Sequence, residues 1–312
     1  DSYAEDNETF NVNFGAVTGP ATADLQTHVV TITAAGDAVS ITVAPNDDDV
    51  APVGNELQVN ETGTTVDTYV ITLNIEPGYT ATTNISAGVD CLVSTDGISF
   101  SPTLTGVTLG ASTVIYVRAV DDAYAETTPH PCLITHSNLT SSVSRFNGQA
   151  VASITANVID NDVPTVVAVA DDDDVAPAGN EIRVSEVNLA LTDTYTITMN
   201  AVPGLTATTV VTADVNCLVS IDNVTFTSSV TATLVGSTPT VIYVRAANDQ
   251  YDEPTLHSCG INHGNTSSAT APFNNVPVNP VVGEVEDNDT FGVNIVQTGG
   301  TTDVAEGGAN DT

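Results

Sequence analysis

The sequence predicts an all-β protein made of tandem seven-stranded antiparallel β-sandwiches with no significant helix. Three observations indicate this fold. The segment DDDVAPVGNE at residues 47–56 returns as DDDVAPAGNE at residues 172–181. Short runs rich in Thr, Val and Ile alternate with Gly, Pro, Asn and Asp, which is typical of strands and turns. No segment shows the 3.6-residue periodicity of a helix.

The repeat has the length of a whole domain. TVIYVRAVDDAYAE at 113–126 returns as TVIYVRAANDQYDE at 240–253, so equivalent positions are 125–127 residues apart. This spacing is too long for a solenoid unit. We expect residues 1–47 to be the C-terminal part of one repeat, 48–162 and 163–289 to be full repeats, and 290–312 to start a further repeat. The sequence would then begin and end within domains of a longer protein.

Each full repeat is predicted to contain seven strands. In the first they span 56–60, 68–75, 81–87, 98–104, 113–120, 132–136 and 151–159, and in the second 181–185, 194–200, 207–213, 224–228, 240–246, 259–263 and 276–285. TYVITLNI alternates as a strand with one buried face does. The Pro-Gly pairs in EPGYT and VPGLT predict matching turns after the second strand.

The charge balance is strongly acidic. The 312 residues include 39 Asp and Glu but 4 Lys and Arg, for a net charge of −35. This sign excludes nucleic acid and anionic membrane surfaces as partners. No apolar run is long enough to span a membrane. Carboxylates about 4 Å apart repel by about 4 kcal/mol per pair at an effective dielectric constant near 20, so clustered acids require a cation.

Four cysteines occupy matching places in the two full repeats. Cys91 and Cys132 are 41 residues apart, and Cys217 and Cys259 are 42 apart. Zinc is disfavoured because no close Cys-Cys or His-Cys spacing exists. Buried free thiols are the alternative to one disulfide per repeat. We predict the disulfides, between neighbouring strands of one sheet, and therefore an extracellular or cell-surface location.

Acidic residues recur at three separated points of each repeat: near the first strand, in the loop after the fifth strand and at the end of the last strand. In the first repeat they are Glu61, Asp121, Asp122, Glu126, Asp160 and Asp162; in the second they are Glu186, Asp249, Asp252, Glu253, Asp287 and Asp289; Glu306 begins the next set. In a sandwich these three points can meet at one pole. Ca²⁺ takes six to eight oxygen ligands with flexible geometry, which suits such a set. The alternative is that these are solvated turn residues.

Together these motifs resemble the Calx-beta family. The resemblance lies in VNETGTTVDTYVITLNIEPG, VAEGGANDT, the VRAVDDAYAE loop, the LITH strand and the terminal VIDND followed by VP. It implies an immunoglobulin-like seven-stranded sandwich that binds Ca²⁺ at one pole through the acids named above. Asn248 stands where the first repeat has Asp121, so the second site would bind fewer ions or bind them more weakly. The cysteine pair is not a general feature of the family.

The remaining candidates are weaker. His136 and His263 lie at equivalent strand ends and are expected to pack rather than to bind a ligand. Asn138 and Asn265 begin Asn-X-Ser/Thr triplets at matching positions and are candidate glycosylation sites. Nothing places a catalytic set, so we expect no enzyme.

The function predicted from the sequence is structural. We expect an extracellular repeat protein, stiffened by Ca²⁺ and pinned by disulfides, that forms a stalk, filament or surface layer by lateral or end-to-end contact with other copies of itself. One alternative is an adhesin that binds a receptor or glycan through its loops. A second alternative is a calcium-responsive regulatory domain.

Overall fold

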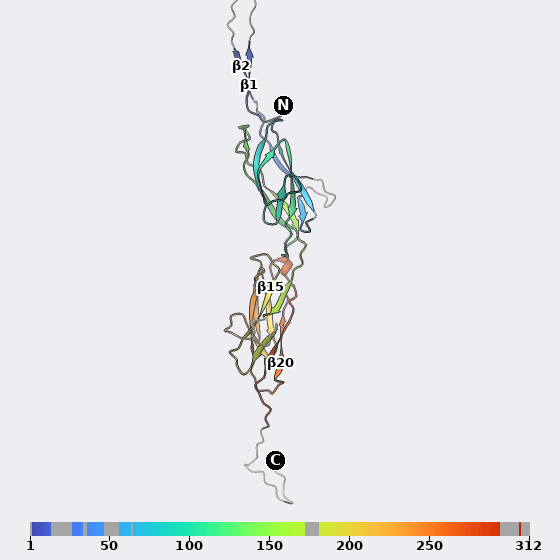
Figure 1. Ribbon diagram of the computed structural model, residues 1–312, viewed down its shortest axis with the longest axis vertical. Helices are drawn as coiled ribbons and strands as arrows, with labels where there is room; N and C mark the ends of the chain where they lie inside the picture. Colours follow the sequence, from blue (N-terminus) through green and yellow to red (C-terminus); the bar gives the residue numbers. More distant parts are fainter. Residues whose placement is uncertain are drawn as a thin grey trace, which may run out of the picture. The chain divides into compact units, whose positions relative to one another are not determined.

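The computed structural model describes residues 2–13, 27–33, 36–46, 56–63, 65–171, 181–293 and Glu306 (Figure 1). The chain divides into two compact units, Asp1–Val163 and Pro164–Thr312. The described residues form strands and one short 3₁₀ turn, η1 (Ala271–Phe273), which confirms the predicted all-β class. The repeated segment DDDVAP lies outside the described residues. No helix in the described part of the chain is long and apolar enough to cross a membrane.

The first unit contains two packed sheets. One has the order β3-β5-β9-β7, and the other has the order β11-β6-β10-β12-β4 with β8 paired to β6. Their bounds are β3 (Ile41–Pro45), β4 (Gln58–Asn60), β5 (Val66–Leu73), β6 (Ala81–Ser86), β7 (Cys91–Ser94), β8 (Thr103–Leu109), β9 (Ser112–Ala119), β10 (His130–His136), β11 (Thr140–Ser141) and β12 (Ile154–Ile159). A separate antiparallel pair, β1 (Glu8–Asn13) and β2 (Thr27–Ile32), precedes them.

The second unit repeats this arrangement. One sheet has the order β13-β15-β19-β17 and the other β14-β21-β20-β16-β18. Their bounds are β13 (Val166–Ala170), β14 (Ile182–Ser185), β15 (Asp193–Met199), β16 (Thr206–Ala213), β17 (Cys217–Ser220), β18 (Ser229–Val235), β19 (Thr240–Ala246), β20 (Leu256–His263) and β21 (Val281–Glu286). Figure 1 labels β15 and β20, one from each of the two sheets.

Small and branched side chains fill the core between the sheets. In the first unit Ile71, Ile115 and Val117 on one sheet and Ile134 and Val158 on the other are all buried. Each alternates with less buried neighbours, as expected of strands with one buried face. Burying a side chain of this size stabilises the fold by about 1.5–3 kcal/mol. The core is built mainly from Val, Ile, Leu and Ala, with Tyr69 and Phe146 as its largest buried side chains in the first unit.

The strand count differs from the predicted seven. The structure adds the cysteine-bearing strands β7 and β17 and the strands β3 and β13. The strand predicted over 98–104 instead begins at Thr103, because Asp96 closes a turn by accepting hydrogen bonds from the backbone N–H groups of Ile98 and Ser99, each 2.8 Å long. Asp222 closes the same turn in the second unit.

Residues predicted to belong to the preceding repeat make hydrogen bonds with the first sandwich. β3 pairs antiparallel with β5, from Ile41 opposite Leu73 to Pro45 opposite Tyr69. The backbone N–H of Ala4 donates to the carbonyl of Asn74 at 2.9 Å. The first unit therefore begins before the segment at 48–162 that the repeat offsets define.

One pair of named strands in each unit is parallel, which the antiparallel prediction missed. β4 runs parallel to β12, with Asn60 opposite Ile159, and β14 runs parallel to β21, with Ser185 opposite Glu286. The first strand of the repeat is only three or four residues long, too short for its sequence to show the direction of its partner. The consequence is that the residues following these two strands leave the sheet at the same pole.

The two predicted disulfides are present, but they join opposite sheets. Cys91 on β7 is bonded to Cys132 on β10, and Cys217 on β17 is bonded to Cys259 on β20, with Cα–Cα distances of 6.2 and 5.9 Å. The expected link between neighbouring strands of one sheet is therefore wrong, because each Cys-Leu-Val-Ser segment forms its own strand on the other sheet. Each disulfide closes the sandwich across its core.

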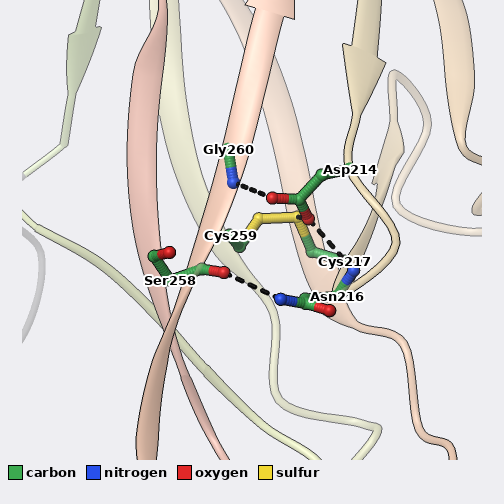
Figure 2. Close-up of a disulfide and its surroundings, with 6 residues drawn as sticks. All are labelled: Asp214, Asn216, Cys217, Ser258, Cys259 and Gly260. Carbon is green, nitrogen blue, oxygen red and sulfur yellow. Dashed lines mark hydrogen bonds between the residues drawn. A yellow bond between two sulfur atoms is a disulfide. The ribbon is translucent and has the colours of Figure 1, made fainter.

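Hydrogen bonds to a neighbouring loop hold the second disulfide on both sides (Figure 2). Asp214 accepts hydrogen bonds from the backbone N–H groups of Gly260 and Asn216, and the Asn216 side chain donates to the carbonyl of Ser258 at 2.9 Å. Ser258 and Gly260 flank Cys259, so the loop that precedes Cys217 is fixed to β20 independently of the disulfide.

A tyrosine–histidine pair also joins the sheets. Tyr69 on β5 contacts Nε2 of His136 on β10 through its hydroxyl at 2.9 Å, and Tyr195 contacts Nε2 of His263 at 2.8 Å. Nδ1 of His136 lies 2.7 Å from the carbonyl oxygen of Ala152, so Nδ1 carries the proton and Nε2 accepts from the tyrosine. Burial lowers the pKa of His136 and of His263 below the ordinary value. These contacts agree with the predicted packing role.

Removing one disulfide should destabilise its own unit. The Cys217→Ser/Cys259→Ser variant removes the crosslink between two cysteines that are 42 residues apart in the sequence. Loss of this crosslink is expected to lower the free energy of unfolding by about 4 kcal/mol in the chain-entropy account. Urea unfolding of both forms measures the change, and the Cys91→Ser/Cys132→Ser variant is the matched control for the first unit. Free thiols in the unreduced protein would contradict the pairing.

The two tyrosine–histidine pairs should make stability fall in mild acid. Because the pKa of each histidine is lower in the folded protein, the unfolded chain takes up protons first as the pH drops. Their contribution is therefore complete above the unfolded pKa of about 6.5 and decreases below it. Urea unfolding between about pH 7.5 and 5.5 should show a smaller pH dependence in His136→Gln/His263→Gln than in the unchanged protein. A pKa at or above the ordinary value, measured by NMR for either imidazole, would refute this account.

Candidate metal centre

The parallel strand pairs bring two acidic residues of each repeat side by side. Glu61 directly follows β4 and Asp160 directly follows β12, and the backbone N–H of Glu61 donates to the carbonyl of Ile159 at 3.1 Å. In the second unit Glu186 follows β14, Asp287 follows β21, and the N–H of Glu186 donates to the carbonyl of Glu286 at 3.0 Å. The sheet itself therefore fixes this pair of carboxylates.

Asp160 connects the loop that contains Glu126 to the same pole. Its Oδ2 accepts a hydrogen bond from the backbone N–H of Glu126 at 3.0 Å, and its Oδ1 accepts one from that of Asp162 at 3.0 Å. Asp287 does the same for Glu253 at 3.3 Å and Asp289 at 3.2 Å. The three acidic points of each repeat consequently meet at one place, as the sequence analysis expected.

The carboxylate oxygens are close enough to share a cation. Ligand atoms of Glu61, Asp160 and Asp162 lie within 4.8 Å of one another, and so do those of Glu186, Asp287 and Asp289. A hard cation with oxygen ligands at about 2.3–2.6 Å fits such a group. We call these groups the first and second carboxylate centres.

Burial makes these centres costly without a cation. Glu61 is 1% exposed and Glu186 is 3% exposed. Burial, together with the neighbouring Asp160, raises the pKa of Glu61 to about 8. Burial also raises the pKa of Glu186 and of Asp162 above their ordinary ranges, and the carboxylates around them add to both shifts. Negative charge is thus unfavourable at several adjacent groups at neutral pH.

Several buried oxygens lack a hydrogen-bond partner among the described residues. They are Oε2 of Glu61, Oε2 of Glu186, Oδ2 of Asp162 and Oδ2 of Asp289. A buried acceptor without a partner normally destabilises a fold by about 1–3 kcal/mol, and more when it is charged. The same atoms are orphaned in both units, which points to a shared ligand rather than to a local packing defect.

The other predicted ligands flank the centres to different degrees. Asp121 accepts a hydrogen bond from the Asn161 side chain at 3.3 Å, and Asp122 accepts one from the N–H of Tyr124 at 2.7 Å. The charges of both raise the pKa of Asp162, so they lie near the first centre.

In the second unit the flanking acids are fewer. Asp249 raises the pKa of Glu186, whereas Asn248 accepts a hydrogen bond from the Asn288 side chain at 2.8 Å. Asp252 is exposed and lies in neither group of clustered ligand atoms. Its counterpart in the first unit is the buried Ala125. Glu306 is exposed.

Three residues beside the centres were not predicted from the sequence. His130 and His257 join Glu61 with Glu126, and Glu186 with Glu253, in further groups whose ligand atoms lie within 4.8 Å. Asp90 lies 3.9 Å from Nε2 of His130. The signal was present: both histidines follow a predicted loop glutamate by four residues, at the repeat offset.

The cysteines of the second unit and the two candidate glycosylation sites can also be located. Asp214 also lies near Cys217 and Cys259, but the sulfurs are bonded to each other and so do not provide thiolate ligands. Asn138 and Asn265 are exposed, with the Asn265 side chain donating to Asn275 at 3.0 Å. Glycosylation at these two asparagines stays a prediction.

Comparison with known proteins gives no family. No family model and no curated protein matches the chain. Among solved structures, CBD12 from CALX1.2 is similar at 10% identity and a TM-score of 0.25, over 75% of this chain and 97% of that one. The D00-D0 domain of intimin is similar at 11% identity and a TM-score of 0.26, over 78% of this chain and 99% of that one. Domains 4–9 of the surface layer protein SbsC are similar at 15% identity and a TM-score of 0.23, over 91% of this chain and 35% of that one.

Proposed function

We propose that each unit is a Ca²⁺-binding β-sandwich of an extracellular structural repeat protein. The observation that carries the proposal is the buried oxygen Oε2 of Glu61, and that of its counterpart Glu186. Each lacks a hydrogen-bond partner among the described residues and belongs to a carboxylate that lies beside two aspartates. Ca²⁺ supplies the positive charge and the coordination that these oxygens lack. The Calx-beta resemblance of the motifs points to the same ion.

The role of the ion is mechanical. Strand β4 is short, and among the described strands it pairs only with β12. An ion bound by Glu61, Asp160 and Asp162 would crosslink the end of that strand to the end of the last strand, as the disulfide crosslinks the two sheets. Disulfides persist in oxidising compartments, which supports a location outside the cytosol.

Contact between copies of the chain is the second part of the proposal. β18 pairs only with β16 among the described strands, and it exposes Thr231, Thr233 and Val235. A strand of another chain can pair with an open edge of this composition. The net charge of −35 opposes such contact, and bound Ca²⁺ reduces that repulsion.

Calcium should stabilise each unit separately. Chelation is expected to lower the melting temperature, because the carboxylates then repel one another. Glu61→Gln and Asp162→Asn should each remove Ca²⁺ binding from the first unit and leave the second intact, so calorimetric titration would show about half of the bound Ca²⁺. Glu8→Gln, at an exposed glutamate of β1, is the charge-matched control. A melting curve that does not respond to thorough chelation would rule the proposal out.

Assembly should depend on Ca²⁺ and on the open edge. Sedimentation is expected to show larger species with Ca²⁺ than with chelator, and the Thr231→Lys/Thr233→Lys variant should remain monomeric because edge lysines block strand addition. Thr105→Lys, on the matching strand β8 of the first unit, tests whether one edge or both take part. A chain that is strictly monomeric in both conditions would contradict the structural role and favour the adhesin alternative.

A further inference from the structure

Two histidines at equivalent positions occupy the core layer beneath the carboxylate centres. His130 on β10 is opposite Val158 on β12, which is in turn opposite Val59 on β4. His257 on β20 is opposite Val285, which is opposite Val184. The four valines are all buried. Each imidazole therefore stands in a row that is otherwise apolar.

These imidazoles are buried without satisfied nitrogens. Their side chains are 8% and 9% exposed, and neither Nδ1 nor Nε2 of either ring has a hydrogen-bond partner in the part of the chain that the structure describes. Burying an unpaired polar group is unfavourable. The contrast with His136 and His263 is informative, because both nitrogens of those rings are bonded.

Carboxylates lie close to both of these rings. Nε2 of His130 lies 3.3 Å from Oε2 of Glu126, and Nε2 of His257 lies 3.4 Å from Oε2 of Glu253, in both cases without the alignment of a hydrogen bond. Glu61 and Glu186 complete each group, within 4.8 Å, with buried oxygens that also lack partners. Each unit thus holds one imidazole and two carboxylates around a common point.

We propose that each of these groups, Glu61/Glu126/His130 and Glu186/Glu253/His257, is a second metal site that takes a borderline transition dication of the Zn²⁺ class. Neutral imidazole is a ligand of such ions and not of Ca²⁺, which takes oxygen ligands. Zn²⁺ with one histidine and two carboxylates keeps a fourth position for water. Glu61 and Glu186 then lie between the two ions of their units.

The site does not require Ca²⁺, since Asp160 and Asp162 are not among its ligands. The first unit should bind the dication more tightly than the second. Asp90 lies 3.9 Å from Nε2 of His130 and adds a negative charge, whereas its counterpart Asn216 is neutral and donates its side-chain N–H to Ser258.

The test uses the intact chain with Ca²⁺ present and Zn²⁺ or Co²⁺ as the probe. Calorimetry should detect two Zn²⁺ per unchanged chain, one in His130→Gln, one in His257→Gln and none in the double variant. Co²⁺ should give the visible absorption of a nitrogen–oxygen site, which should be reduced in each single variant and absent in the double variant. His28→Gln, at an exposed histidine of β2, is the matched control. Asp162→Asn should lose Ca²⁺ from the first unit yet retain both Zn²⁺, which separates failure of this proposal from failure of the calcium proposal.

Two results would overturn the proposal. One is Zn²⁺ binding that is the same in the double variant as in the unchanged chain, and the other is no binding in the unchanged chain. Melting curves without metal show whether each variant folds. In the unchanged chain the imidazole ¹⁵N resonances of His130 and His257 should shift on adding Zn²⁺, and those of His136 and His263 should not. If none of these resonances moves, the two histidines are ion-pair partners of Glu126 and Glu253 and the site does not exist.

Discussion

The parallel pairing of β4 with β12, and of β14 with β21, is the constraint on which the carboxylate centres depend. Parallel neighbours end at the same edge of a sheet, so Glu61 after β4 and Asp160 after β12 are adjacent by register. An antiparallel partner would place Glu61 at the other pole, next to the start of the last strand. Asp160 then fixes the backbone of Glu126 and Asp162 through its two oxygens. The position of every central ligand follows from one short ladder.

A single strand distributes the stabilising groups of each unit. The core-facing positions of β10 are, in order, His130 beside the carboxylate centre, Cys132 in the disulfide, Ile134 in the apolar core and His136 bonded to Tyr69. The same series occupies His257, Cys259, Ile261 and His263 of β20. The disulfide and the tyrosine–histidine contact thus lie further along the strand than the carboxylate centre. Because they hold the two sheets together at those positions, the sandwich stays closed although the carboxylates at its end repel one another.

The sequence predicted the features that recur in both repeats. It did not predict the direction of a strand or the position of a single turn. The repeat offset was enough to pair Cys91 with Cys132 and to group most of the acidic residues. Residues of the same type that recur at a constant spacing can be recognised without knowing the fold. The direction of β4 was not visible, because three residues carry no information about their partner. Strand β7 was missed because Asp96 bends the chain directly after it. His130 was overlooked because an isolated histidine has no distinctive pattern until the neighbouring strand places it beside Glu61.

The two repeats keep the geometry of the centre and change its charge. Asp90, Asp121 and Ala125 of the first unit correspond to Asn216, Asn248 and Asp252 of the second, and Asp252 is exposed away from the cluster. The hydrogen bond between Asn161 and Asp121 persists between Asn288 and Asn248, so the loop is held without the carboxylate. Each added carboxylate increases both the repulsion within the centre and the attraction for a cation. The Ca²⁺ that we propose would therefore stabilise the first unit more than the second, although the two units share one fold.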